Sequence, residues 1–348
     1  MPPVPEHCGA RREQHGDPKR QHGTKGFTDR RRTTPARTSG GRGRRALTPR
    51  QPDLRKIVSG FAWAAVTVTI FAGWFVVTRF GVTRELRVWD ITALRFGFGT
   101  LILLPVLLGR TGRLPKGAWT EGLLFAALWG APFVLLVAMG LQLTSAAQAS
   151  SVTPTMMPVF SGAIAWLALR ERPGRDRLAG YAAIIAGLVG LTVGASLSGA
   201  SPSPAGFACL LLASAMWALY TLRFRRSGLA PIQAAALICF WSAVLFLPAY
   251  LAFGLARLGS APIQEVVVQT VYQGILMSAV AIVTFNRAVS LLGSGAATAI
   301  VALVPVMASV MAIPILGEIP TPIEGVAIAV IVIGVTLAAR PPRAGAPA

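Results

Sequence analysis

The sequence predicts an all-α polytopic membrane protein with ten transmembrane helices arranged as two inverted five-helix repeats, preceded by a disordered basic tail. Composition is the first basis for this prediction. Of the 348 residues, 53% are hydrophobic and 13% are charged, whereas soluble globular domains carry about 25% charged residues. A disordered polyelectrolyte is excluded, because such chains lack apolar residues. The large formal net charge of +20 must therefore be separated from the apolar segments.

The basic tail, residues 1–56, holds half of that net charge. It contains 15 Lys/Arg and 5 Asp/Glu, against 18 and 8 in the rest of the chain. Its richness in Arg, Gly, Pro and Thr predicts disorder. The end nearest the body is expected to attract anionic lipid headgroups. We expect no nucleic-acid partner, because no aromatic residues are interleaved with the arginines. An alternative origin of the tail is a start site assigned too far upstream.

Ten stretches of the body are long and apolar enough to cross a bilayer, which takes about 20 residues per helix. Charges or Gly/Pro clusters separate them, except that the breaks near 141–146 and 291–295 carry no charge. The first stretch is too long for a signal peptide, and a long tail precedes it. The predicted spans are 57–80, 89–109, 117–140, 144–169, 177–197, 204–223, 232–254, 265–290, 294–316 and 321–339.

The distribution of Lys and Arg between the loops predicts the orientation. With a cytoplasmic N-terminus, the inner connections of the body carry 12 Lys/Arg and the outer connections carry 4, namely Arg79, Arg84, Arg87 and Arg257. Cytoplasmic loops are normally the more basic ones. Both termini are therefore expected in the cytoplasm of a bacterial cell, with the helices in its inner membrane. An even number of spans, such as ten, satisfies this requirement.

An internal repeat appears when the chain is shifted by 147 residues. The shift superimposes breaker and charge residues: Pro158 on Pro305, Leu169 on Leu316, Glu171 on Glu318, Pro173 on Pro320 and Gly187 on Gly334. Each copy would hold five helices, and an odd number gives the copies opposite orientations. We therefore predict repeats at 57–200 and 201–340, a short C-terminal tail at 341–348, and a substrate site near the midplane where the repeats meet.

The same residues carry a family resemblance. The segment Thr144–Phe160 with its Pro-Val pair, followed by Leu-Arg-Glu-Arg-Pro at 169–173, resembles the EamA branch of the drug/metabolite transporter superfamily. Leu-Val-Pro-Val at 303–306 and Ala-Leu-Arg-Phe at 93–96 are similar to that family too, while Trp74 is displaced by one helical turn from its usual place. The resemblance implies ten helices in two inverted halves, transport of small metabolites such as amino acids, and a cavity lined mainly by helices 1, 3, 4, 6, 8 and 9.

Polar and aromatic side chains at helical spacing mark candidate faces for the substrate path, because polar groups within a bilayer usually face the bundle interior. In the eighth span this face comprises Gln273, Met277, Thr284 and Arg287, with Asn286 adjacent. In the third span, Phe133 accompanies the candidate Trp129. The predicted pathway residues are Trp63, Thr67, Trp74, Arg95, Trp129, Gln148, Ser151, Thr155, Trp217, Thr284 and Asn286.

Each candidate also has a purely structural interpretation. Ser and Thr hydroxyls can bond their own helix backbone and tighten helix packing, and Trp often lies in the interfacial belt. Gln148 and Trp74 are favoured, because a buried amide needs partners and Trp74 lies near the middle of its face. Arg95 lies deep in its span and is expected to pair with carbonyls or a carboxylate; binding of a substrate carboxylate is the alternative.

The repeated motif residues are expected to shape helices rather than to bind. Pro158 and Pro305 remove backbone hydrogen bonds and bend their helices, which either frees carbonyls toward a cavity or only adjusts packing. Glu171 and Glu318 lie at helix ends beside loops, where capping is their expected role.

Enzyme chemistry has no basis in the sequence. The three cysteines are scattered, no histidine follows His22, and the eight acidic residues of the body lie near span ends. No metal or cofactor is expected, and a buried carboxylate for proton coupling is not supported. We predict a secondary transporter of small molecules working by alternating access, with export as the expected direction. A non-transporting or lipid-handling membrane subunit is the alternative, and a homodimer is left open.

Overall fold

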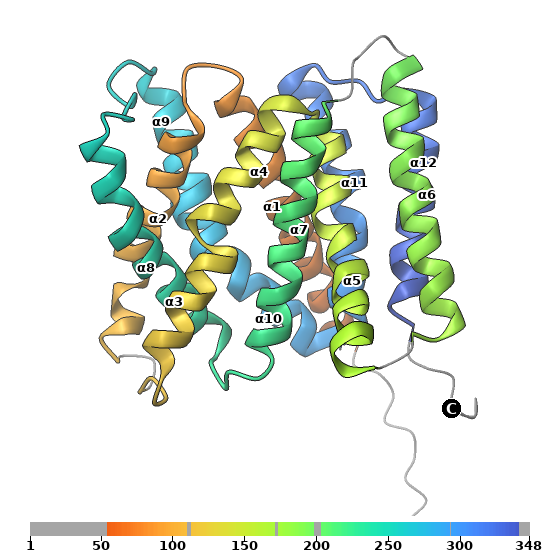
Figure 1. Ribbon diagram of the computed structural model, residues 1–348, viewed down its shortest axis with the longest axis horizontal. Helices are drawn as coiled ribbons and strands as arrows, with labels where there is room; N and C mark the ends of the chain where they lie inside the picture. The colour runs from red at the N-terminus through yellow and green to blue at the C-terminus, as the bar shows by residue number, and fades with distance from the viewer. Residues whose placement is uncertain (1–53, 110–112, 171–172, 198–202, 293, 341–348) are drawn as a thin grey trace, which may run out of the picture. The chain divides into compact units, whose positions relative to one another are not determined.

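The computed structural model describes residues 54–109, 113–170, 173–197, 203–292 and 294–340, all in one contact unit. Within these ranges the chain is helical and contains no strand (Figure 1). The tail up to residue 53 and the C-terminal residues 341–348 lie outside them. The elements are α1 (Leu54–Val82), α2 (Val88–Leu107), α3 (Ala118–Trp129), α4 (Ala131–Leu143), α5 (Ala146–Leu169), α6 (Arg175–Leu197), α7 (Pro204–Phe224), α8 (Pro231–Ala252), α9 (Ile263–Gln269), η1 (Thr270–Val280), α10 (Ala281–Leu292), α11 (Ser294–Leu316) and α12 (Pro322–Ala338).

Seven helices or helix runs among the described residues are long and apolar enough to cross a membrane. They are α1, α2, α3 with α4, α6, α7, α8, and α9 with η1 and α10. Shorter apolar helices cover Ile300–Leu316 and Pro322–Ala338, and α5 is a further helix of 24 residues. The prediction of an all-helical membrane protein is confirmed.

Two predicted spans are not continuous α-helices. The third breaks at Gly130, where a Cβ would collide with the Ser242 hydroxyl and the Ala126 carbonyl. That hydroxyl accepts a hydrogen bond from the first backbone N–H of α4, at Ala131, over 3.2 Å. The eighth contains an 11-residue π-helix, η1, between α9 and α10. Such segments with i→i+5 hydrogen bonds are rare and frequently lie at functional sites.

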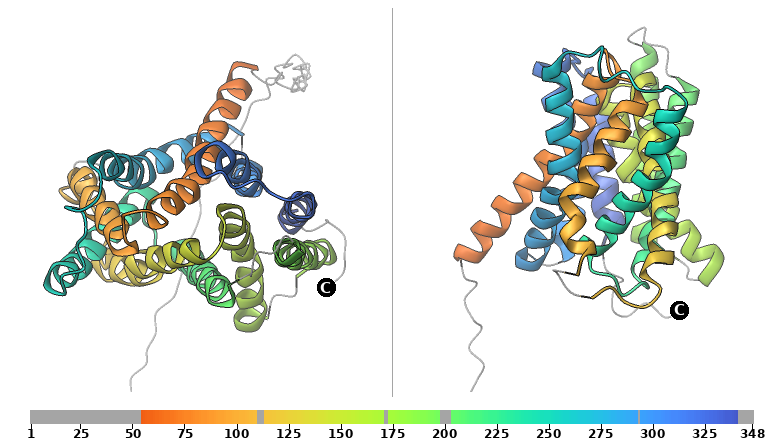
Figure 2. Two further views of the ribbon diagram at one scale, coloured as in Figure 1. Left: turned by 90° about the horizontal axis from the view of Figure 1, so that it is seen from above. Right: turned by 90° about the vertical axis from the view of Figure 1, so that its left-hand side faces the viewer.

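Helices from the two halves of the chain interleave. The most extensive pairings, α5 with α11 among them, join an element before residue 198 to one after residue 203, and Figures 1 and 2 show such elements side by side. The other pairs are α1 with α10 and α11, α2 with α8 and η1, α3 with α8, α4 and α5 with α7, and α6 with α12. A site in the interior is therefore built from both halves.

The pair α6–α12 is packed through glycine. A Cβ at Gly180 would lie 2.5 Å from the Ala338 nitrogen and 2.6 Å from the Gly334 oxygen, and one at Gly334 would lie 2.8 Å from the Ile184 nitrogen. Gly190 and Gly194 also face α12, since Cβ atoms there would meet Ala327 and Ile323. Small residues let helix backbones approach closely within a bilayer.

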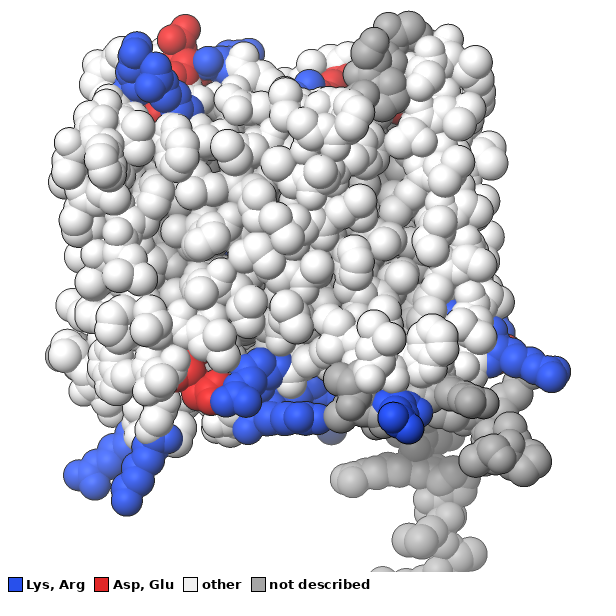
Figure 3. All heavy atoms as spheres, in the orientation of Figure 1, with Lys and Arg blue, Asp and Glu red and all other residues white. Residues whose placement is uncertain are grey.

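Charged side chains gather at two opposite edges of the molecule. Figure 3 shows Lys, Arg, Asp and Glu above and below a broad belt of uncharged side chains. Large apolar side chains such as Leu167, Leu245 and Val310 are exposed on the helix surfaces. This distribution matches a bilayer, whose hydrocarbon core admits few charges.

Candidate functional site

A buried carboxamide lies at the centre of a polar cluster between α1, α2 and η1. Gln273 is fully buried and accepts a hydrogen bond from Trp74 Nε1 over 2.9 Å. Its own Nε2 donates to Thr78 Oγ1 at 2.8 Å and to Gln269 Oε1 at 3.2 Å. Gln269 in turn donates to the Val77 carbonyl at 2.5 Å. With Arg95, the side chains of residues 74, 78, 269 and 273 form what we call the Gln273 cluster.

Arg95 contributes a buried positive charge to this cluster. Arg95 is 7% exposed, and its Nη1 donates to Gln273 Oε1 over 3.4 Å, which is long for a hydrogen bond. The guanidinium carbon lies 5.1 Å from the ring centre of Trp74 and 5.9 Å from that of Phe96. Among the described residues no carboxylate forms an ion pair with it. Carbonyls or a carboxylate were the expected partners, and the acceptor in the described chain is the carbonyl oxygen of the Gln273 side-chain amide.

An aromatic row extends from the cluster toward α3 and α7. Trp74 stacks on Phe133 with ring centres 6.3 Å apart, and Phe133 lies 6.0 Å from Trp129 and 6.1 Å from Trp217. Trp129 stacks on Trp217 at 5.9 Å and on Tyr220 at 4.7 Å. These five rings, which we call the aromatic row, unite three of the predicted pathway residues. Phe133 and Trp74 are buried, so the row starts in the interior.

Besides Glu265 Oε2 in α9, three polar atoms of α3 and α5 are buried without a hydrogen-bond partner among the described residues. They are Trp129 Nε1, Ser151 Oγ and Thr153 Oγ1. Buried polar groups are normally paired, and each exception calls for an explanation. Two of the three belong to residues predicted for the substrate path.

Gln148 and Thr155 have local partners in α5. The Gln148 side-chain oxygen accepts from the Ser145 backbone N–H at 3.2 Å, while Ser145 Oγ accepts from the Gln148 backbone at 3.1 Å. This reciprocal pair is a capping box that begins the helix. The Thr155 hydroxyl donates to the Ser151 carbonyl one turn earlier. Both side chains are buried, but their described bonds stabilise the helix itself.

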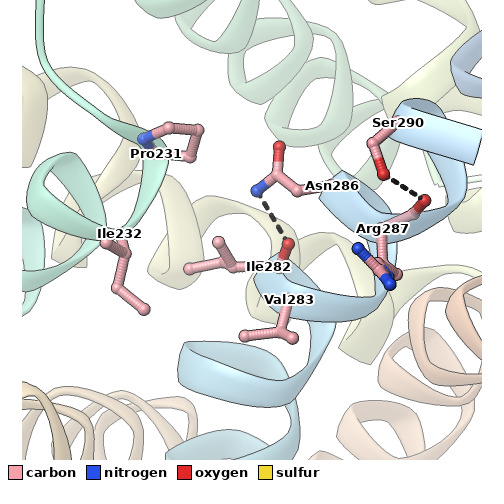
Figure 4. A pocket seen from close by; sticks show the side chains of 7 residues that line it. All are labelled: Pro231, Ile232, Ile282, Val283, Asn286, Arg287 and Ser290. Carbon is pink, nitrogen blue, oxygen red and sulfur yellow. Dashed lines mark hydrogen bonds between the residues drawn. The ribbon is translucent and has the colours of Figure 1, made fainter. Parts of the chain in front are cut away.

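The remaining pathway candidates also bond their own helices and lie apart from the Gln273 cluster. The Thr67 hydroxyl donates to the Trp63 carbonyl at 2.8 Å and that of Thr284 to the Ala281 carbonyl at 3.1 Å. Asn286 donates to the Ile282 carbonyl at 2.8 Å. Asn286 lines a pocket of about 390 Å³ between α8 and α10 (Figure 4). Its other lining residues are Pro231, Ile232, Ile282, Val283, Arg287 and Ser290.

Glu318 ties together elements from both halves at one edge of the molecule. One carboxylate oxygen accepts from Arg79 Nε at 2.7 Å, and the other accepts from the Ala146 backbone N–H at the start of α5 at 2.9 Å. Arg79 also donates to the Leu141 carbonyl at the end of α4 over 2.5 Å. We call this arrangement the Arg79–Glu318 lock. Pro158 and Pro305 lie inside α5 and α11, whereas Glu171 lies outside the described residues.

Asp90, near the start of α2, has a buried carboxylate whose tertiary contacts were not predicted from the sequence. Asp90 is fully buried; it accepts from Tyr250 Oη at 2.5 Å and from the backbone N–H groups of Arg257 and Arg87, each at 2.9 Å. It fixes the loop after α8 against α2. Only its place near a helix end could be read from the chain, since its partners are distant in sequence.

Gln273 was predicted from the sequence to lie on the polar face of the eighth span, but it was not included among the predicted pathway residues. Its importance depends on contacts with α1 and α2, which no local pattern reveals. Among the described residues no group of three His, Cys, Asp or Glu could hold a metal ion. The Gln273 cluster thus offers one fixed positive charge, amide donors and acceptors and an adjoining aromatic surface.

Comparison with known proteins identifies the family. The EamA-like transporter family matches residues 58–193 and again residues 204–340. A probable terminal-alkyne amino-acid exporter of Streptantibioticus cattleyicolor is 32% identical over 197 residues, which make up 55% of this chain and 63% of that relative. A crystal structure of a protein described without a function shares the fold with a TM-score of 0.55 at 20% identity, over 81% of this chain and 96% of the other. With two matched segments covering most of its length, the chain belongs to the EamA-like transporter family, whose members are transporters and not enzymes.

Proposed function

We propose that the chain is a secondary transporter that exports small metabolites, amino acids or related compounds, by alternating access. The observation that carries this proposal is the Gln273 cluster, a charged and amide-rich group buried between helices of the bundle. Such groups are costly within a bilayer and usually belong to a transport path. The cluster is assembled from α1 and α2 of one half and α9 and η1 of the other, so relative motion of the halves would change it.

The proposed topology has ten spans in two inverted repeats, 57–200 and 201–340. Counting α3 with α4 and α9 with η1 and α10 as single spans gives five helices on each side of residue 200 within the described chain. An odd number per repeat gives opposite orientations. The excess of Lys and Arg in the loops assigned to the inner side, 12 against 4, supports cytoplasmic termini in a bacterial inner membrane.

Amino acids are the favoured substrate class for two reasons. The relative described above is named as an amino-acid exporter. The aromatic row supplies an apolar surface that begins at Trp74 of the Gln273 cluster, and Trp129 Nε1 and Ser151 Oγ are buried polar groups with no hydrogen-bond partner among the described residues. A small amphipathic solute suits such a site. The cluster comes from a single chain, so the proposal does not require an oligomer.

A flux assay tests this function. Purified full-length protein in proteoliposomes is expected to move radiolabelled L-phenylalanine or the terminal-alkyne amino acid L-propargylglycine, both chosen as probes. Trp74→Ala should reduce the flux about tenfold or more, because it removes both a buried hydrogen bond and the first ring of the aromatic row. Comparing metabolites in media of cells with and without the protein covers solutes outside the panel. If no solute moves and labelled lipids instead exchange between leaflets, the lipid-handling alternative replaces transport.

A further inference from the structure

The partners of Arg95 do not neutralise its charge. Ion pairs between described residues join Arg79 to Glu318, Arg84 to Glu265 and Arg223 to Glu121, and none of these includes Arg95. A guanidinium has five N–H donors, and the described chain offers this one a single amide acceptor at 3.4 Å. A buried charge without a counter-ion costs several kcal/mol. Among the described residues, the site therefore holds no anion that pairs with Arg95.

The one acceptor that Arg95 has among the described residues is shared with Trp74. Gln273 Oε1 already accepts from Trp74 Nε1 at 2.9 Å, the shorter of its two hydrogen bonds. A carboxylate arriving at the guanidinium could take over its donors and would leave the Trp74 bond in place. Arg–carboxylate pairs are short, frequently bidentate, and stronger than bonds to a neutral amide.

The nearest acidic residue along α2 cannot serve as that anion. Asp90 precedes Arg95 by five positions, and its carboxylate is occupied by Tyr250 and by the backbone N–H groups of Arg257 and Arg87. The same bonds keep it from pairing with an ammonium group in the cluster. The Gln273 cluster itself contains no carboxylate. An amino-acid solute would thus find a strong partner for its carboxylate and none of comparable strength for its ammonium group.

We propose that Arg95 is the anchor for a solute carboxylate, and that the aromatic row receives the apolar body of that solute. The substrate class is then small monocarboxylates with an apolar side chain, amino acids among them, in which the carboxylate contributes more to binding than the ammonium group. This inference rests on the transport function proposed above and adds the group that the protein recognises.

A competition series separates the two ends of the solute. Full-length protein in nanodiscs is equilibrated with radiolabelled L-phenylalanine, and 3-phenylpropanoate, L-phenylalaninamide and phenethylamine are added as competitors. The acid without an amino group should compete within about tenfold of L-phenylalanine, whereas the amide and the amine should be at least about tenfold weaker, the usual value of one charge-assisted hydrogen bond. An amine or amide that competes as well as the acid would overturn the inference, as would binding of none of the four.

Substitutions of Arg95 connect this preference to the residue. Arg95→Gln should weaken L-phenylalanine binding about tenfold or more and abolish the preference for acid over amide, while Arg95→Lys should restore part of both. The matched control is Arg225→Gln, an exposed arginine after α7, which should leave both unchanged. An Arg95→Gln protein that elutes as a monodisperse species and still prefers acids refutes the assignment. Transport of amines or neutral solutes by the wild type would refute it while leaving the transport function intact.

Discussion

At the scale of single residues, one carboxamide organises the interior. The Gln273 side chain accepts hydrogen bonds from the Trp74 indole and from Arg95, and it donates one to the Thr78 hydroxyl. An amide can do this because it donates and accepts at once. An apolar and a charged replacement of similar size are therefore expected to affect stability and solute binding differently.

Gln273→Leu should destabilise the protein by roughly 1–3 kcal/mol, because it leaves the buried Trp74 and Thr78 groups without partners. Gln273→Glu should retain stability, since its carboxylate can pair with Arg95, but should block solute binding by occupying that guanidinium. Thermal unfolding in detergent and binding of L-phenylalanine measure the two effects. Gln264→Leu, at an exposed glutamine of α9, is the control. Normal binding by Gln273→Glu would contradict the expectation.

Hydrogen bonds within a single helix can be anticipated from the sequence, whereas contacts between distant elements cannot. The hydroxyls of Thr67, Thr155 and Thr284 bond preceding carbonyls, as the structural interpretation of such residues expects. The central position of Gln273 could not be predicted from a helical period of 3.6, because the residue lies in a π-helix. The Ser278 hydroxyl donates a hydrogen bond to the Gln273 carbonyl five residues earlier. That change in pitch alters which side chains share a face.

At the scale of elements, the Arg79–Glu318 lock connects α1, the end of α4, the start of α5 and the loop before α12. In the proposed topology the lock lies on the outer side, where we expect it to close an entrance to the Gln273 cluster. Both partners are partly exposed, at 21% and 23%, so the pair is worth roughly 1 kcal/mol. A contact of this strength can break and re-form during each transport cycle.

Glu318→Gln should open this entrance more often, by about fivefold if 1 kcal/mol is lost. The measurement is the rate at which an impermeant maleimide labels Val82→Cys, a buried position at the end of α1, in a background without native cysteines. Exchanging the charges with Arg79→Glu and Glu318→Arg should restore slow labelling. Glu121→Gln, which breaks the ion pair with Arg223 at the other edge, should have no effect. Equal rates for Glu318→Gln and the parent would refute the lock.

The contact between α6 and α12 gives a second prediction for paired elements. Gly180→Val places side-chain atoms against the backbone of Gly334 and Ala338, so it should cost about 1–3 kcal/mol and lower the unfolding temperature in detergent. Gly325→Ala, where a Cβ has no neighbour within 4 Å, is the control. An unchanged unfolding temperature for Gly180→Val would show that these helices are not held together in the membrane protein.

The sequence could predict that these elements exist, because long apolar runs and Lys/Arg boundaries are local properties. It could not predict the break at Gly130, which depends on Ser242 of α8 approaching its backbone. Gly190 and Gly194 have the Gly-x-x-x-Gly spacing that is typical of close helix packing, but the closest approaches to α12 lie at Gly180 and Gly187. Which glycines approach most closely is determined by the partner helix α12, and it cannot be read from the spacing of glycines within α6.

At the scale of the whole molecule, charge is segregated between two edges, and this follows directly from the sequence. The interleaving of the halves does not follow from it, because the repeat describes each half separately. Pairs such as α2–α8 and α4–α7 mean that neither repeat can bury its polar residues alone. The two copies are therefore expected to fold and insert as one cooperative unit.

Orientation provides the final prediction. In the body alone, the connections assigned to the cytoplasm hold three times as many Lys and Arg as the outer ones, 12 against 4, and this bias sets topology. In a background without native cysteines, an impermeant maleimide should label Gly259→Cys in intact spheroplasts and Arg226→Cys only after lysis. Deleting residues 1–50 should leave this pattern unchanged, because the loop arginines suffice. A pattern that reverses upon the deletion would assign control of orientation to the basic tail.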